Sequence, residues 1–303
     1  MEHTRIGDFA ITKIVESCGP TFELNFLLPD AEHSFINEHR DWLFPTYIDP
    51  DSEILIASFH SYLIRTAHHN ILIDTCVGND KERPGFPEMH CLRTDYLSQL
   101  KSVGLSPEDI DYVMCTHMHP DHVGWNTRLE NGQWVPTFAN AKYLFGRTEF
   151  DAWQAYHNDI AGSDDDPIPA PISQVLGFTF EDSVLPVIRA KQALMIEDGH
   201  EIESGMTVES APGHTPGNFV VNLVSKGRKA ILSGDLMHHP IQVLRPEWSS
   251  GFCADPVLSA ETRRHILERI SDTNTLVLPA HFPTPTWGVI QSSSKGFRFS
   301  PTE

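Results

Sequence analysis

Short apolar runs, separated by polar turns, divide the chain into strand-like segments with helix-like segments between them. Ile54–Arg65 and Asn70–Asp74 are rich in β-branched residues and are predicted to be strands joined by a turn at residues 68–70. A second hairpin is predicted where Lys226-Gly227 separates two apolar runs. The other predicted strands, including the two of this hairpin, are Tyr112–Cys115, Ala141–Phe145, Val184–Ala190, Thr207–Ser210, Asn218–Ser225, Lys229–Ser233 and Thr275–Leu278.

Helix signals occur between these strands. The predicted helices are Tyr96–Val103, a short helix that begins at Ser106, Arg147–His157 and Ser259–Ile270. Gly104 is the expected C-terminal cap of the first helix, and Ser259 opens the last one. The acidic, proline-rich segment Ala161–Ser173 is predicted to be a loop in which Asp164–Asp166 are exposed to solvent.

Single helices that alternate with groups of strands indicate an α/β architecture. Residues of the kinds that bind metals recur just after the strands, so we expect a site built from loops at strand ends. The proline-rich loops do not divide the sequence, and we therefore expect one domain over residues 1–303. Residues 1–50 are expected to be an N-terminal extension that covers the pocket or an interface of a homodimer.

Charge and composition narrow the classes of function. The formal net charge is −19, with 22 basic against 41 acidic residues, which disfavours nucleic acid and anionic membranes as partners. The sequence has no run of about 18 apolar residues and no secretory leader pattern, so we expect a cytoplasmic protein. The five cysteines include no C-x-x-C pair, and we expect neither a disulfide framework nor a cysteine zinc site.

The segment Thr116–Asn126, THMHPDHVGWN, concentrates histidine and aspartate directly after a predicted strand. His117 and His119 are two residues apart, so they point the same way on an extended chain. A proline then bends the chain, which lets Asp121 and His122 face the same cavity. Imidazole and carboxylate groups together suit zinc, iron or manganese. The alternative is a solvated histidine-rich loop.

Three later segments each present one residue of the same kind near the end of a strand. The turn PGHTPG contains His214, the segment SGD ends in Asp235, and the segment PAH ends in His281. Each is weak evidence alone, because a histidine after a strand is usually a surface residue. In this order, after the histidine-rich segment, they indicate one common site.

These segments resemble the metallo-β-lactamase superfamily in type and order. The resemblance extends from about Ser58 to His281 and includes the block Ile71–Asp74. It implies an αββα sandwich, in which two sheets face each other, helices lie outside, and the metal site is at one edge. By the family's pattern, His117, His119 and His214 would hold one divalent metal ion, Asp121, His122 and His281 a second, and Asp235 would bridge both. Zinc is the expected metal, with iron, manganese or cobalt as alternatives.

The resemblance implies a dinuclear hydrolase in which a metal-bridging hydroxide attacks the substrate. The expected substrate is a small neutral ester or lactone. One alternative is a phosphotriester, as in enzymes that resemble methyl parathion hydrolase. A glutathione thioesterase and a non-catalytic metal-binding protein rank below these two.

Two residues are predicted to act in catalysis. Asp121 would accept the proton of the hydroxide or help to pass it to the leaving group. His238 follows Asp235 by three residues, near a position where lactonases of the superfamily often have a tyrosine. It is either a substrate-side or supporting group, or a structural or surface histidine. Aromatic residues of the loops either line an apolar pocket or belong to the core, and they are Phe22, Phe26, Trp42, Phe44, Trp125, Trp248 and Phe252.

Overall fold

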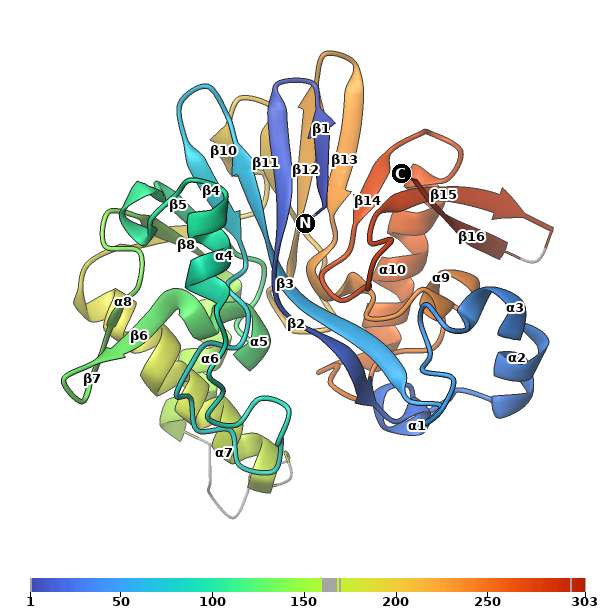
Figure 1. Cartoon of the computed structure of the whole chain (residues 1–303), viewed down its shortest axis with the longest axis horizontal. Coiled ribbons are helices and arrows are strands. Elements are labelled where there is room, and N and C mark those ends of the chain that lie inside the picture. The colour runs from blue at the N-terminus through green and yellow to red at the C-terminus, as the bar shows by residue number, and fades with distance from the viewer. Residues whose placement is uncertain (1, 160–167, 169, 295, 303) are drawn as a thin grey trace. The chain divides into compact units, whose positions relative to one another are not determined.

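The computed structural model describes residues 2–159, 168, 170–294 and 296–302. Within them, strands form two seven-stranded sheets and one two-stranded sheet (Figure 1). The chain divides into two compact units: unit 1 comprises Met1–Glu16 and Phe59–Glu197, and unit 2 comprises Ser17–Ser58 and Asp198–Glu303. Each unit therefore combines a segment from the first 58 residues with a longer segment from later in the chain.

The first large sheet has the strand order β1-β2-β3-β4-β5-β8-β9. Its strands are β1 (His3–Ile6), β2 (Phe9–Phe22), β3 (Leu55–Arg65), β4 (Asn70–Ile73), β5 (Tyr112–Cys115), β8 (Lys142–Gly146) and β9 (Ala193–Ile196). β5 pairs in parallel with both β4 and β8, with Val113 opposite Leu72 and Tyr143. Central parallel strands are covered on both faces, which explains why β5 is apolar along its length instead of alternating.

The second large sheet has the order β10-β11-β12-β13-β14-β15-β16. Its strands are β10 (Glu201–Glu203), β11 (Met206–Ser210), β12 (Phe219–Ser225), β13 (Arg228–Leu232), β14 (Leu276–Leu278), β15 (Gly288–Ser293) and β16 (Gly296–Pro301). The predicted hairpin between β12 and β13 is confirmed: Lys226 and Gly227 form its turn with φ angles of 49° and 75°. Two positive φ angles are what a tight hairpin turn of this kind requires.

Ten α-helices and one small hairpin lie between the strands of the two sheets in the described part of the chain. The small hairpin is β6 (Thr127–Glu130) with β7 (Gln133–Pro136). The helices are α1 (Leu24–Leu27), α2 (His33–Glu38), α3 (Arg40–Leu43), α4 (Tyr96–Ser102), α5 (Pro120–Val123), α6 (Arg147–Asp159), α7 (Ala170–Thr179), α8 (Leu185–Arg189), α9 (Ile241–Leu244) and α10 (Pro256–Ile270). Among the described residues, none of these helices combines the length and the apolar character that crossing a bilayer demands.

The predicted strand Val184–Ala190 is wrong. A π-helical turn, Phe180–Val184, leads directly into α8, and the strand that follows is β9. The apolar run is too short for its spacing to distinguish a strand from a buried helix. Pro186 is the local signal for a helix, because proline is well tolerated in a first helical turn.

Two further boundaries differ from the prediction by three residues or more. α10 begins at Pro256, and its cap is Asp255, whose carboxylate accepts a hydrogen bond from the Leu258 amide at 2.9 Å. Ser259 therefore lies inside the helix. The predicted loop Ala161–Ser173 ends earlier than expected, because α7 already begins at Ala170. The exposed run predicted at Asp164–Asp166 lies outside the described residues.

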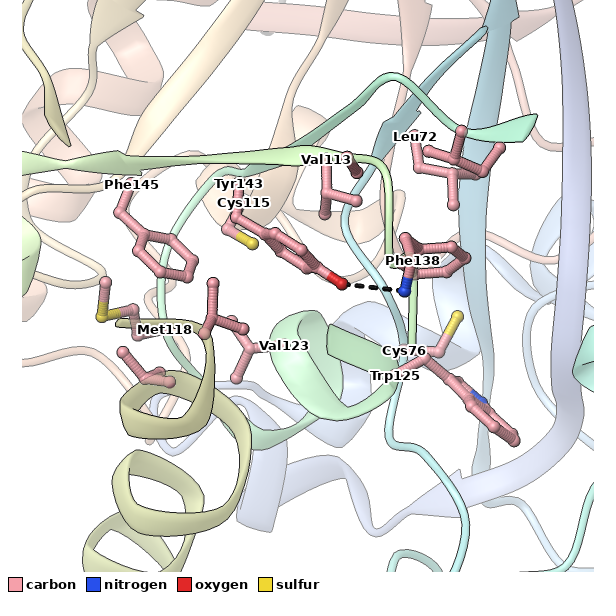
Figure 2. Packing of buried hydrophobic residues seen from close by; sticks show 14 of the residues in the cluster. Leu72, Cys76, Val113, Cys115, Met118, Val123, Trp125, Phe138, Tyr143 and Phe145 are labelled. Atoms are coloured by element: carbon pink, nitrogen blue, oxygen red, sulfur yellow. Dashed lines mark hydrogen bonds between the residues drawn. The ribbon is translucent and has the colours of Figure 1, made fainter. Parts of the chain in front are cut away.

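The hydrophobic core of unit 1 lies beneath the segment Thr116–Asn126. Figure 2 shows Met118, Val123 and Trp125 of this segment packed with Val113 and Tyr143 from the parallel strands. Met118 lies between His117 and His119, and Val123 follows His122 directly. Their burial therefore fixes which way the polar side chains of the segment point.

Candidate metal centre

The histidine-rich segment forms a compact turn at the end of β5. The strand ends at Cys115, His119 precedes the short helix α5, and Pro120 occupies its first turn. The ring centroids of His117 and His122 lie 4.0 Å apart, and those of His117 and His119 lie 4.7 Å apart. An oxygen of Asp121 lies 3.7 Å from His122 Nε2. Unit 1 thus brings all four predicted ligands of this segment together.

One buried carboxylate, that of Asp74, orients two of these histidines. His122 Nδ1 lies 2.9 Å from Asp74 Oδ2 and donates its proton there. The Thr116 hydroxyl also donates to Asp74 Oδ2, at 2.9 Å, so it can accept a proton from His117 Nδ1 at 3.1 Å. Both imidazoles then carry their proton on Nδ1, and Nε2 of each is the nitrogen with the lone pair that a metal requires.

A second buried carboxylate, that of Glu16, holds the end of the segment. It accepts hydrogen bonds from Trp125 Nε1 at 2.6 Å, the Val77 amide at 2.8 Å and the Thr94 hydroxyl at 3.1 Å. Burial raises the pKa of Glu16, and these donors partly offset that effect. The Trp125 ring also stacks on Tyr96, with centroids 5.4 Å apart.

Close backbone packing fixes the same turn against the loop that follows β4. The Gly124 amide donates to the Cys76 carbonyl and the Trp125 amide to the Thr75 carbonyl, both at 2.8 Å. A Cβ atom on Gly124 would lie 1.7 Å from the carbonyl oxygen of Val77, so only glycine fits at this position.

A third buried carboxylate, that of Glu149 in α6, binds the middle of the segment. It accepts hydrogen bonds from the Met118 amide at 3.0 Å and from Trp153 Nε1 at 2.8 Å. Met118 lies between two of the predicted ligands. Sequence reasoning assigned no role to Asp74, Glu16 or Glu149. The only signal was the block Ile71–Asp74, which carried part of the family resemblance.

In unit 2, three imidazoles surround the carboxylate of Asp235. His214 Nε2 lies 3.3 Å and His238 Nε2 3.2 Å from Asp235 Oδ2, and His281 Nε2 lies 3.1 Å from Oδ1. All four residues are buried. Asp235 follows β13, His281 follows β14, and His214 lies in the turn between β11 and β12. The predicted ligands of this unit therefore converge through the ends of neighbouring strands.

Burial and the carboxylate of Asp235 shift the pKa values of two of these histidines in opposite directions. Burial works to lower the pKa of His214, but the Asp235 carboxylate and the Cys253 thiol, 3.5 Å from His214 Nδ1, outweigh it and raise the pKa to about 9. For His238, burial prevails over Asp235 and lowers the pKa to about 4. His238 is therefore a neutral imidazole at pH 7 and donates to Asp235 from Nε2.

The chemistry and spacing of these side chains suit a divalent metal ion. Bonds of zinc to imidazole and carboxylate of about 2.1 Å place neighbouring ligand atoms of a tetrahedron roughly 3.4 Å apart. The separations between Asp235 and the imidazoles of His214 and His281 are 3.3 and 3.1 Å. Ligand atoms of His117 and His119 lie within 4.8 Å of each other. The donors therefore fit zinc-type ligation in both units.

His238 lies in the interior and not at the surface. Its backbone amide donates to Gln242 Oε1 at 2.7 Å, and its ring stacks on His281 with centroids 5.5 Å apart. Within the described residues, its Nδ1 atom is buried and has no hydrogen-bond partner. The substrate-side role of His238 stays a prediction.

Comparison with known proteins adds independent evidence. The family model described as "Metallo-beta-lactamase superfamily" matches residues 60–281. An N-acyl homoserine lactonase from a Bacillus species is 28% identical over 177 residues, which is 55% of this chain and 58% of the relative. The N-acyl homoserine lactonase AttM from Azorhizobium caulinodans is 28% identical over 200 residues, which is 62% of this chain and 64% of the relative. The chain thus spans less than two thirds of the length of these curated relatives.

Two solved structures are similar over almost the whole chain. AidC, a dizinc quorum-quenching lactonase, matches with a TM-score of 0.82 and 22% identity, covering 100% of this chain and 97% of AidC. The hydrolase AbOPH matches with a TM-score of 0.81 and 24% identity, covering 99% of this chain and 97% of AbOPH. At these identities the likeness establishes the fold, an α/β fold with two sheets.

Proposed function

Because the chain belongs to the metallo-β-lactamase superfamily and has its fold, we propose that it is a metal-dependent hydrolase that opens small neutral lactones. The observation that carries the proposal is that all seven histidines and aspartates predicted as ligands fall into groups that could hold a metal ion, with His122 and His281 each beside a buried carboxylate. The N-acyl homoserine lactonases among the relatives support a lactone as the substrate. They favour it over the phosphotriester, thioester and non-catalytic alternatives.

We assign the ligands in two sets. The first set is His117, His119, His214 and Asp235, and the second is Asp121, His122 and His281, with Asp235 shared between them. Each set combines imidazole nitrogen with carboxylate oxygen, which suits zinc without excluding iron, manganese or cobalt. When bound, two such ions supply an activated water and a Lewis acid for the lactone carbonyl.

Asp121 is the residue we assign to proton transfer. Its carboxylate is more exposed than that of Asp235, with 13% of the side chain accessible against 3%. A carboxylate that reaches the substrate side can take the proton of the attacking water. When the ring C–O bond breaks, the same carboxylate returns that proton to the leaving alkoxide, so the product is a hydroxy acid.

His238 is a positioning residue in this proposal. Its neutral imidazole donates from Nε2 to Asp235, the carboxylate that both ligand sets share. The hydrogen bond keeps one carboxylate oxygen in a fixed orientation. A contact between His238 Nδ1 and the substrate is the alternative role.

The test combines elemental analysis with initial rates on a small panel of substrates. The panel holds N-hexanoyl homoserine lactone, an aryl carboxylic ester, an aryl phosphotriester, a glutathione thioester and a penicillin. We expect about two metal ions per chain and the highest kcat/KM for the lactone. His214→Ala is expected to lose both metal and activity. A chain that binds no metal after reconstitution, or one that prefers another bond, would contradict the proposal.

A further inference from the structure

A cavity of about 930 Å³ lies within unit 2, and none of the residues that line it is a proposed metal ligand. Its walls come from α2, α3, the segment after α9 and the β15–β16 hairpin, all of which lie in unit 2. Binding sites for small molecules typically have volumes of about 300–1,000 Å³. The cavity is therefore large enough for a ligand of its own.

Aromatic rings form much of the cavity wall. Phe35, Trp42 and Phe297 are half-buried, Tyr47 is buried, and all four line the cavity. The rings of Trp42 and Tyr47 meet edge to face, with centroids 5.8 Å apart. Such a wall takes up an apolar group and, because the rings pack on one another, keeps its shape without a ligand.

The charge of the lining is opposite to that of the molecule. The lining contains three arginines, Arg245, Arg264 and Arg298, and one carboxylate, that of Glu247. Its net charge is therefore +2, in a chain whose net charge is −19. Arg245 Nε pairs with Glu247 at 2.5 Å, and Arg264 lies 3.6 Å from the same carboxylate. Arg298 is exposed and has no ion pair within the described part of the chain.

Packing holds one of these arginines in place. The Arg245 guanidinium lies over the rings of Phe35 and Trp248, 5.2 and 4.5 Å from their centroids. Such contacts fix the direction of the guanidinium. Arg298, on β16 opposite Gln291, has its charge free for an incoming anion. Guanidinium groups bind carboxylates well because the two planar groups can share paired hydrogen bonds.

We propose that this cavity binds an anionic amphiphile, a carboxylate joined to an aromatic or medium-length acyl group. Arg298 receives the carboxylate, and the aromatic wall receives the apolar part. The positive net charge of the lining disfavours a cation of the same shape. The proposal does not depend on the hydrolase reaction, because the cavity and the metal ligands share no residue.

The test is calorimetric titration of the metal-loaded protein with decanoate. Decan-1-ol, the neutral analogue, and decyltrimethylammonium, the cationic one, serve as matched ligands. Arg298→Gln is compared with Arg228→Gln, which removes an exposed arginine of the β12–β13 hairpin outside the cavity. We expect decanoate to bind the wild type and the Arg228→Gln variant equally, and the Arg298→Gln variant about tenfold more weakly.

Several outcomes would overturn the proposal. Equal affinity for the two arginine variants would place the carboxylate elsewhere, for example on the metal ions. Affinity for decan-1-ol equal to that for decanoate would remove the role of charge. Sedimentation at several protein concentrations shows whether the chain forms a dimer. If decanoate binds only at dilutions at which such a dimer has dissociated, the cavity belongs to an interface with a second copy of the chain. Both variants replace exposed residues, so thermal denaturation should leave their midpoints unchanged.

Discussion

Asp74 determines the proton positions of two histidines at once. It accepts directly from His122 Nδ1, and through the Thr116 hydroxyl it acts on His117 Nδ1. Asp74 adopts a left-handed backbone conformation, with a φ of 57°, which aspartate and asparagine tolerate better than most residues. A single side chain at this position therefore prepares one ligand from each of the two proposed sets.

Replacing Asp74 by asparagine tests this arrangement. Asn keeps the size and tolerates the backbone conformation, but its single oxygen cannot replace both carboxylate oxygens: Oδ2 accepts from His122 Nδ1 and the Thr116 hydroxyl, and Oδ1 accepts from the Thr116 amide. We expect metal affinity to fall about 10- to 100-fold while the protein stays folded. Competition with a chromogenic chelator measures the affinity, and circular dichroism verifies the fold. Wild-type affinity in the variant would show that the tautomers are set in another way.

Asp121→Asn separates proton transfer from metal binding. The amide keeps an oxygen that can bind metal but cannot carry a proton. We expect kcat for lactone opening to fall about 10²- to 10⁴-fold with two metal ions still bound. Metal content by elemental analysis and initial rates are measured on the same sample of the variant and are compared with those of the wild type. Full turnover by the variant would remove Asp121 from the proton path.

At the residue scale, the sequence grouped the proposed ligands but did not reveal the residues that hydrogen-bond to them. His117, His119, Asp121 and His122 are near neighbours along the chain, so spacing alone grouped them. The residues that hydrogen-bond to this segment are distant along the chain: Asp74 lies 42 positions from Thr116, and Glu16 lies 109 positions from Trp125. Long-range pairs of this kind depend on the sheet order, which no local pattern contains.

Among the elements, the turn that carries His122 depends on contact between two backbones. A Cβ atom on Gly124 would lie 1.7 Å from the Val77 carbonyl oxygen, and one on Gly78 would lie 2.7 Å from the Gly124 backbone. The two glycines therefore allow the loop after β4 and the turn that carries His122 to approach each other closely. This packing holds the turn independently of any metal.

Gly124→Ala should disrupt that contact. Its φ of −60° suits alanine, so the cost comes from the steric overlap alone. We expect the free energy of unfolding to fall by about 3 kcal/mol, together with weaker metal binding. Gly177→Ala is the matched control, because a Cβ atom there meets no atom within 4 Å inside α7. The control should gain about 0.5–1 kcal/mol in urea denaturation. A Gly124→Ala variant as stable as the wild type would contradict the packing argument.

A buried ionic cluster fixes the π-helical turn before α8. Asp182 accepts two hydrogen bonds from Arg83, at 2.8 and 3.0 Å, and lies 3.4 Å from Lys81 Nζ. The Lys81 ammonium also lies 3.6 Å above the Trp134 ring. Burial lowers the pKa of Lys81 to about 7, although Asp182 partly opposes the shift.

This shift predicts a pH dependence of stability. Below pH 7 both the folded and the unfolded chain protonate Lys81, whereas from pH 7 to about 10 only the unfolded chain does. The free energy of unfolding should therefore rise with pH in this window, by up to about 1.4 kcal/mol per pH unit. Lys81→Met should flatten the slope, and Lys142→Met, at an exposed position, should not. Urea denaturation at pH 7, 8 and 9 measures the slope for the wild type and for each variant. A slope for Lys81→Met equal to that of the wild type would exclude Lys81 as the cause.

Patterns of apolar residues located most strands but failed where a run was short. The parallel strand Tyr112–Cys115 and the hairpin at Lys226-Gly227 agree with the prediction because an apolar run and a turn pair are local signals. The strand prediction failed at Val184–Ala190, which is helical, because a run of five apolar residues with one proline and one arginine is too short for its spacing to distinguish the two structures. The α2–α3 segment and the β15–β16 hairpin received no prediction, although they form part of the wall of the cavity in unit 2.

For the whole molecule, the proposed ligands are spread between residues 117 and 281. An ion that binds only the folded chain stabilises it by an amount that grows with the ratio of its concentration to Kd. Chelation should therefore lower the melting temperature on the order of 5–10 °C, and added zinc should restore it. Differential scanning calorimetry with and without chelator checks this, using His214→Ala as a variant that should not respond. An unchanged melting temperature would contradict tight binding.

The arrangement around Trp125 makes the ligand turn observable without a label. Its indole stacks on Tyr96 and donates to Glu16, and it lies three residues after His122. Two aromatic chromophores fixed in an asymmetric, buried pair give rise to a near-ultraviolet circular dichroism band. A movement of the turn changes the angle between them, and the band changes with it. The molecule therefore contains an intrinsic optical probe of its own metal-ligand turn, which a Tyr96→Phe variant would serve to assign.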